Sequence, residues 1–168
     1  MDILGFQSGH DVSYCVLRDG KPIIHEELER FIREKEPRGD GLKMAFERLP
    51  VSFFKDLKVF AYGNLNTRHQ AEPVNHPEFD DKMKDVLEKN KGELYAIGHH
   101  QSHAANAFFS SNFDKALVIT IDGSGTDKVD WQDHKKDTTE LNRDEYFSTA
   151  FTFWEGEDLD IKPIDRIP

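Results

Sequence analysis

The sequence predicts an α/β fold with a mixed sheet flanked by helices, and three observations carry that prediction. Short apolar runs of strand length recur along the chain, and between them the apolar residues follow a helical period. The Asp-Gly pair at residues 19–20 joins two of those runs in the way typical of a β-hairpin. Strands that alternate with helices along a chain are typical of the α/β class.

The chain opens with three expected strands. Residues 3–6 form a short apolar run that indicates a buried strand, and residues 12–17 indicate a second one. Residues 22–26 return from the Asp-Gly hairpin, and Pro22 is tolerable because it stands near the start of that strand. Residues 28–35 mix charges so densely that we expect a turn or an irregular segment there.

Helices and strands alternate in the middle of the chain. Residues 41–49 carry apolar residues at helical spacing, and Asp40 is placed to cap that helix. A second, amphipathic helix is expected over residues 79–90, with Gly92 as its C-terminal cap. The strands of this region are expected at residues 57–62 and 94–97.

A helix and the most apolar run of the chain come next. The helix is expected over residues 99–109, with Ala104, Ala107 and Phe108 packed inward. Residues 116–121 are so apolar that we expect a central strand buried on both faces, which ends in the Asp-Gly-Ser-Gly sequence.

The last part of the chain begins with a change of composition. Residues 126–145 contain few large apolar side chains, so we expect a mobile or extended surface loop. Residues 146–154 are again strand-like, Gly156 is expected to turn the chain, and residues 159–164 could pair back.

The charge balance and the cysteine count exclude several classes of function. With 22 Lys and Arg against 32 Asp and Glu, the net charge is −10. Binding to nucleic acid or to a membrane surface needs clustered basic residues, so we expect neither. No run approaches the roughly 20 apolar residues of a membrane span. The only cysteine, Cys15, cannot form an intramolecular disulfide, which fits a protein of the reducing cytoplasm.

Two histidines indicate a metal site. His99 and His103 stand four residues apart, which on a helix places both imidazoles on one face. Both can then reach one ion, since metal–nitrogen bonds are about 2.0–2.1 Å long. The same pattern also fits a helix start with solvated histidines. His100 points about 100° away from His99, so we assign it to the fold or to a supporting position behind the ligands.

A carboxylate and two glycines follow the most apolar run. Asp122 is expected at the end of a buried strand, where α/β sheets bind their ligands. Gly123, Ser124 and Gly125 come next, and glycine amides can hold a phosphate. A plain hairpin turn is an equally good interpretation of this segment.

A histidine and an aspartate follow the first strand. His10 and Asp11 stand side by side in the sequence after a Ser-Gly pair. A histidine beside a carboxylate can act as a general base, because its unperturbed pKa lies near physiological pH. The other interpretation is a solvated turn.

Two blocks of sequence follow a known pattern. Residues 5–35 contain a glycine, a His-Asp pair, a serine, an Arg-Asp-Gly hairpin and a Glu-Arg-Phe-x-Arg-x-Lys segment. Residues 99–127 contain His-His-x-x-His-Ala-x-x-Ala-Phe-Phe, then an apolar strand, then Asp-Gly-x-Gly. In this order the two blocks resemble the O-carbamoyltransferase family typified by nodulation and antibiotic-tailoring carbamoyltransferases.

The resemblance implies a fold and an activity. The fold is a ribonuclease-H-like lobe of the actin/Hsp70/sugar-kinase superfamily, here as an N-terminal lobe over residues 1–168. The activity uses ATP and carbamoyl phosphate to make a carbamoyl-adenylate, and it transfers the carbamoyl group to a hydroxyl of a sugar or another natural product. A divalent metal is implied as well; iron serves some members, and the spacing leaves zinc or magnesium open.

The resemblance also assigns roles by position. His10 matches the histidine at the acceptor hydroxyl, with Asp11 beside it. The metal ligands match His99, His103 and Asp122. The nucleotide-side turn matches Gly123, Ser124 and Gly125.

The chain departs from the family in two respects. Members are far longer, so the second lobe and the adenylate-forming domain are expected on a missing C-terminal part or on a partner chain. Thr126 and Asp127 replace the acidic residue that usually follows Gly-x-Gly. We expect this piece alone not to complete the reaction. The alternatives are a non-catalytic binding or assembly subunit, and a threonylcarbamoyl-transferase-like enzyme of the same superfamily.

Overall fold

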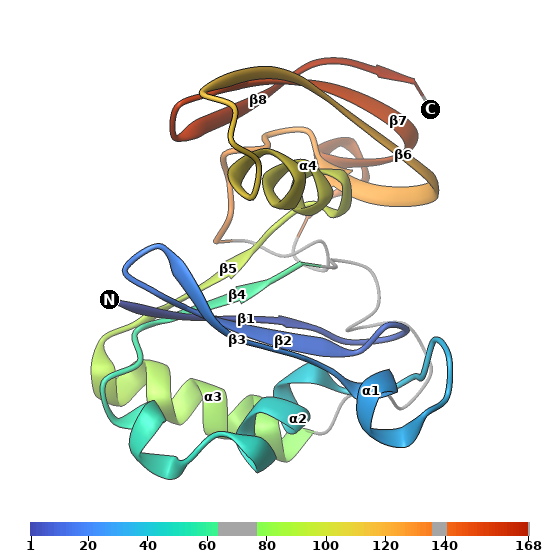
Figure 1. Cartoon of the computed structure of the whole chain (residues 1–168). Coiled ribbons are helices and arrows are strands. Elements are labelled where there is room, and N and C mark those ends of the chain that lie inside the picture. Colours follow the sequence, from blue (N-terminus) through green and yellow to red (C-terminus); the bar gives the residue numbers. More distant parts are fainter. Residues whose placement is uncertain (64–76, 136–140, 168) are drawn as a thin grey trace. The chain divides into compact units, whose positions relative to one another are not determined.

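The computed structural model describes residues 1–63, 77–135 and 141–167, and it divides into two compact units, Met1–Ala96 and Ile97–Pro168. Each unit has a sheet of its own, and helices pack on both sheets (Figure 1). The α/β class predicted from the sequence is therefore confirmed. Within the described ranges, no helix is both long enough and apolar enough to cross a membrane.

The first unit is built on a mixed five-stranded sheet in the order β3-β2-β1-β4-β5. Its strands are β1 (Asp2–Gln7), β2 (Ser13–Arg18), β3 (Lys21–Glu27), β4 (Val59–Tyr62) and β5 (Glu93–Ala96). The first three strands run antiparallel, and β1, β4 and β5 run parallel. The predicted Asp-Gly hairpin is confirmed, with Pro22 opposite Leu17 near the start of β3.

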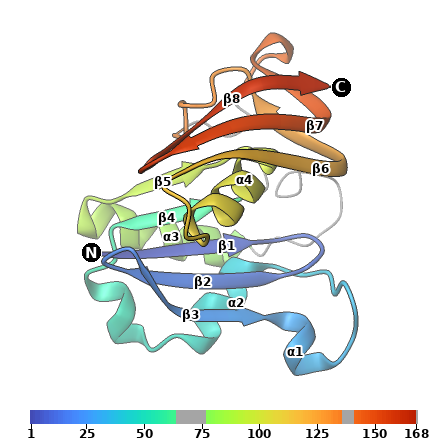
Figure 2. The same cartoon turned by 45° about the horizontal axis from the view of Figure 1, so that its top comes forward.

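The helices of this unit are α1 (Leu28–Ile32), α2 (Gly41–Arg48) and α3 (Pro77–Asn90), and α2 and α3 lie on one side of the sheet (Figures 1 and 2). The core between sheet and helices includes Leu4, Phe6, Tyr14, Val16, Leu42, Phe60 and Tyr62. Phe46 of α2 stacks on Phe54 with ring centroids 4.3 Å apart. This packing anchors α2, and the side chain of Asp40 accepts hydrogen bonds from the amides of Leu42 and Lys43, which confirms the predicted cap.

Two expectations for the first unit were wrong. The segment expected to be irregular contains α1. Leu, Glu and Arg are good helix formers, and the charges of Glu and Arg do not prevent a helix. Gly92 does not provide the left-handed cap of α3; Lys91 does, with φ of 53°. Gly92 is required for space instead, since a β-carbon there would lie 2.9 Å from Cδ2 of Leu87 and overlap the carbonyl of Lys58.

In the second unit, helix α4 (His99–Phe109) packs on a three-stranded antiparallel sheet in the order β6-β7-β8. The strands are β6 (Lys115–Lys128), β7 (Tyr146–Glu157) and β8 (Asp160–Ile167). The core between helix and sheet consists of Ala104, Phe108, Val118, Trp154 and Ile161. Ala107, which was expected to pack inward, is exposed because this narrow sheet contacts only one side of α4.

The most apolar run does not form a strand buried on both faces. β6 stands at the edge of its sheet, and Leu117, Ile119 and Ile121 are 63%, 50% and 68% exposed. The reason is that α4 covers one face of the sheet, so only alternate residues such as Val118 and Thr120 are buried.

The strand also does not end at Asp122. It continues to Lys128, and the pairing with β7 shifts register between Ile121 and Gly125. Residues 126–128 of the expected loop are therefore strand residues, and they are buried because they lie against the start of α4 or pair with β7. Residues 136–140 of that loop lie outside the described residues.

The chain turns after Gly156 rather than at it. Gly156 is part of β7, and the turn falls at Asp158 and Leu159, where Asp158 has φ of 54°. A β-carbon on Gly156 would lie 2.6 Å from the ring of Phe108, so the glycine makes room for α4 on the sheet. The return strand expected at residues 159–164 is confirmed as β8.

Candidate metal centre

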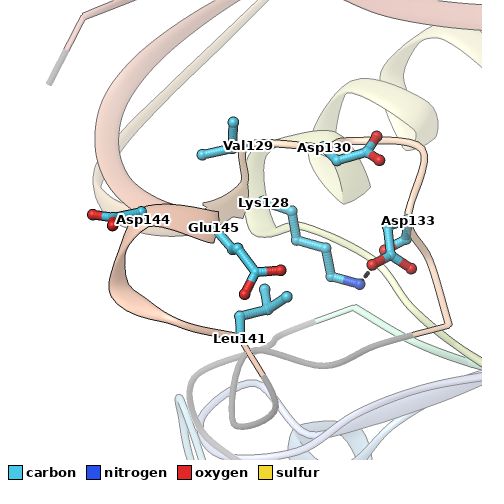
Figure 3. Close-up of a pocket in the computed structure, with 7 residues that line it drawn as sticks. All are labelled: Lys128, Val129, Asp130, Asp133, Leu141, Asp144 and Glu145. Carbon is cyan, nitrogen blue, oxygen red and sulfur yellow. Dashed lines mark hydrogen bonds between the residues drawn. The ribbon is translucent and has the colours of Figure 1, made fainter.

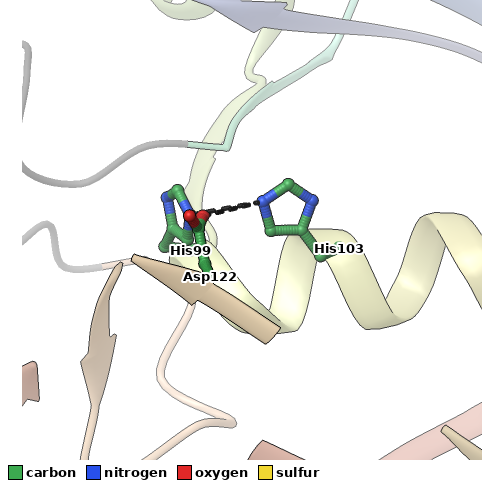
Figure 4. A group of neighbouring side chains, drawn as sticks. All are labelled: His99, His103 and Asp122. Carbon is green, nitrogen blue, oxygen red and sulfur yellow. Dashed lines mark hydrogen bonds and ion pairs between the residues drawn. The ribbon is translucent and has the colours of Figure 1, made fainter. Parts of the chain in front are cut away.

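The three predicted metal ligands lie together in the second unit (Figure 4). His99 and His103 occupy the first two turns of α4, and Asp122 comes from the irregular part of β6. The Nε2 atom of His99 is 2.6 Å from Oδ2 of Asp122 and 3.2 Å from Nε2 of His103. The Nε2 atom of His103 is 3.6 Å from the same carboxylate oxygen. One atom from each side chain thus points to a common position.

The surroundings favour the protonation states that bind metal. The hydrogen bond from His99 lowers the pKa of Asp122 below its ordinary value. Desolvation lowers the pKa of His103, and the neighbouring His99 acts in the same direction. A carboxylate that ionises easily and an imidazole that stays neutral are the forms that coordinate a cation.

The donor set fits a divalent transition metal. Two imidazole nitrogens and one carboxylate oxygen suit iron or zinc better than magnesium, which prefers oxygen ligands. Three protein ligands leave coordination positions open for a substrate or water, as in catalytic sites. The side chain of His99 is 16% exposed and that of His103 is 59% exposed, so the open side is on the His103 side of the cluster.

The glycines beside Asp122 have different surroundings. The amide of Gly123 donates to Oδ1 of its neighbour Asp122 at 2.6 Å, and the space where its β-carbon would stand is open. Ser124 is exposed. Gly125 pairs with Thr149 of β7, and a β-carbon there would overlap the ring of His99. Neither glycine has a left-handed φ, and nucleotide binding at residues 123–125 stays a prediction.

Two buried groups hold α4 in place. The imidazole Nδ1 of His100, which the sequence assigned to the fold or to a supporting position, lies 3.0 Å from Oγ1 of Thr120 and 3.2 Å from Oγ1 of Thr152, on neighbouring strands. Asp127, 3% exposed, accepts hydrogen bonds from the amides of His100 and Gln101 at the start of the helix. In the sequence, the sign that the cap of α4 must come from elsewhere is Gly98, which precedes the helix and has no side chain to cap it.

The predicted catalytic pair lies in the first unit. Nδ1 of His10 is 2.7 Å from Oδ2 of Asp11, and both side chains are more than half exposed. Ser8, fully buried, donates to Oδ1 of Asp40 at 3.0 Å and accepts the amide of Gly41 at 3.1 Å. The loop with His10 is therefore tied to the start of α2. The role of His10 as a base stays a prediction.

A separate hollow of about 130 Å³ opens beside the end of β6 (Figure 3). Its lining includes four acidic residues, Asp130, Asp133, Asp144 and Glu145. Its one basic side chain, Lys128, donates to the backbone carbonyl of Asp133. Such a lining repels phosphate groups, so this hollow does not fit an anionic substrate.

Comparison with known proteins shows that this chain is similar to part of longer proteins. No protein-family model matches it. An uncharacterised protein of Synechocystis sp. is 29% identical over 149 residues, which take in 69% of this chain and 24% of the relative. An uncharacterised protein of Methanocaldococcus jannaschii is 32% identical over 124 residues, which take in 73% of this chain and 22% of the relative. The chain thus spans less than a quarter of the length of each of these curated relatives.

Proposed function

We propose that this chain is the N-terminal part of an ATP- and carbamoyl-phosphate-dependent O-carbamoyltransferase. The observation that carries the proposal is the convergence of His99, His103 and Asp122, the residues that the family resemblance assigns to the metal. The first unit adds support, because a hairpin start followed by parallel strands agrees with the expected ribonuclease-H-like lobe.

In the proposed reaction the acceptor hydroxyl attacks the carbonyl carbon of carbamoyl-adenylate. The new bond joins the acceptor oxygen to that carbon, the bond from the carbon to the phosphate oxygen breaks, and AMP leaves. A hydroxyl is a poor nucleophile until it loses its proton. We assign that proton to the imidazole of His10, and Asp11, whose Oδ2 lies 2.7 Å from Nδ1 of that ring, orients it.

The site in the second unit has an electrostatic role in this scheme. A divalent cation bound there would stabilise the negative charge that develops on the phosphate leaving group. The protein's own contribution is to hold two imidazoles and one carboxylate at fixed positions. This matters in a chain of net charge −10, which otherwise offers little attraction to a nucleotide.

Metal analysis tests the assignment. Purified wild-type protein should retain about one equivalent of a divalent metal, and the His99→Ala/His103→Ala variant should lose it. The variant His25→Ala removes an exposed histidine of the first unit and should leave the metal content unchanged. Equal metal content in all three proteins would overturn the ligand assignment.

Calorimetry with ATP tests the link to the nucleotide. ATP should bind the metal-loaded wild type more tightly than the His99→Ala/His103→Ala variant. Carbamoyl phosphate and ATP together should release pyrophosphate only when the remainder of the enzyme is supplied. Metal binding without any effect on ATP binding would favour the non-catalytic alternative.

A further inference from the structure

Helix α4 begins without a cap of its own. The first amides of any helix lack partners within the helix, and a side chain at the preceding position normally accepts one or two of them. In α4 that position is Gly98, which has no side chain. The two carboxylate oxygens of Asp127 instead accept hydrogen bonds from the amides of His100 and Gln101, with N–O distances of 3.3 and 3.4 Å.

The residue that caps α4, Asp127, belongs to the regularly paired part of the sheet. Asp127 pairs with Phe147 of β7 in the regular ladder, and the residue is almost fully buried. The fit against the helix start is close, because a β-carbon on Gly98 would lie 3.2 Å from Cγ of Asp127 and overlap its Oδ1 atom. A local cap at residue 98 and the carboxylate of Asp127 therefore exclude each other.

The same strand carries the third candidate ligand. Asp122 lies on β6 within the register shift between Ile121 and Gly125, and Asp127 lies after it. The distance between His99 and Asp122 thus depends on where the start of α4 is attached to β6. Asp127 makes part of that attachment through two hydrogen bonds, one from each of the two residues that follow His99, and the contact between the side chains of His100 and Thr120 makes another part.

We propose that Asp127 is a positioning residue for the metal site: by capping α4 from β6, it holds the imidazoles of His99 and His103 against Asp122. The inference rests on the proposed function for its metal, but the geometry it describes exists without one. It goes beyond helix stability, because any good cap would stabilise the helix, whereas a cap from β6 also ties the first turn of the helix to the strand that carries Asp122.

Three variants separate a role of Asp127 in positioning the metal ligands from a role in helix stability alone. Asp127→Ala removes the cap. Gly98→Asp in the Asp127→Ala background supplies a cap from the chain of α4 itself, in the space that the missing carboxylate leaves. Asp114→Ala removes an exposed aspartate with the same loss of charge and serves as the control.

Binding of Co²⁺ and its visible spectrum report the site, and the unfolding midpoint followed by Trp154 fluorescence reports the stability of the second unit. We expect Asp127→Ala to lower the midpoint and to weaken Co²⁺ binding about 10- to 100-fold, the range typical of residues that orient metal ligands. The Gly98→Asp/Asp127→Ala variant should recover the unfolding midpoint of the wild type but neither its Co²⁺ affinity nor its Co²⁺ spectrum. If it recovers all three, Asp127 is only a helix cap and the proposal is overturned.

A metal-free measurement keeps the test independent of the proposed function. Nuclear Overhauser effects between the ring protons of His99 and the protons of Asp122 and Gly125 should be present in wild type and absent from both Asp127→Ala proteins. Their persistence in the double variant would overturn the proposal even in a protein that binds Co²⁺. If wild type binds no Co²⁺, the proposed function fails, and the Overhauser effects still decide whether Asp127 positions His99.

Discussion

Nε2 of His99 lies 2.6 Å from Oδ2 of Asp122, and this contact joins the first residue of α4 to the irregular part of β6. The contact lowers the pKa of Asp122, and the His99 ring lies so close to the backbone of Gly125 that a β-carbon there would overlap it.

Gly125→Ala should disturb the candidate metal site, and Gly123→Ala should not. A β-carbon on Gly125 would overlap the His99 ring and lie 2.7 Å from Cδ2 of His100, whereas the space at Gly123 is open. Overpacking of this kind costs about 1–3 kcal/mol. Denaturant unfolding followed by the fluorescence of the buried Trp154 measures the cost in the second unit. Equal stability of the two variants would contradict the close approach of His99 to β6.

Asp122→Asn should destabilise the metal-free protein at neutral pH and lose that effect in acid. The pKa of Asp122 is lowered by folding, so its carboxylate contributes stability above about pH 3.8, and the contribution is lost as the pH falls through the lower folded pKa. The side chain is 39% exposed, so solvent screening limits the effect to less than about 1 kcal/mol. Unfolding midpoints of both proteins from pH 7 to pH 2.5 check this. A difference that grows in acid would have the wrong sign.

His100→Asn should reduce the loss of stability on mild acidification. Burial lowers the pKa of His100 in the folded state, and the unfolded imidazole titrates near 6.5, so protons favour unfolding as the pH falls below that value. Asparagine keeps a polar group near Thr120 and Thr152 but does not titrate. Between pH 7.5 and 5.5 the wild type should therefore lose more stability than the variant. The exposed His25→Asn variant should behave like wild type in the same unfolding series.

Ser8→Ala and Asp40→Ala should each destabilise the start of α2, and the two effects should not add. Ser8 is buried between the carboxylate of Asp40 and the amide of Gly41, so its loss costs about 1–3 kcal/mol. Removal of the Asp40 cap costs about 0.5–2 kcal/mol. Hydrogen exchange of the Leu42 and Lys43 amides, with the double variant, measures the coupling. Ser124→Ala, at an exposed serine of the second unit, should leave the exchange of these two amides unchanged.

Much of the fold follows from local patterns in the sequence. The hairpin at residues 19–20, the cap at Asp40 and the helix over residues 99–109 are confirmed, because each depends on residues adjacent in the chain. The spacing of His99 and His103 likewise places both rings on one side of α4 without reference to the rest of the molecule.

The errors fall where burial depends on what packs against an element. The run at residues 116–121 looks like a strand buried on both faces, but only α4 covers it, and a sequence does not state how many faces will be covered. The sequence indicates Gly92 as a helix cap and Gly156 as a turn. In the structure both glycines admit a neighbouring backbone or ring, which no local pattern reveals.

The sequence by itself determined most of the elements and the hairpin, because propensity and periodicity act over a few residues, and the family resemblance supplied the set of three candidate ligands. Only the tertiary structure decided that Asp122 meets His99 and that Asp127, rather than a neighbour in the chain, caps α4. Those contacts depend on the register between a helix and a strand more than twenty residues apart, and packing sets that register.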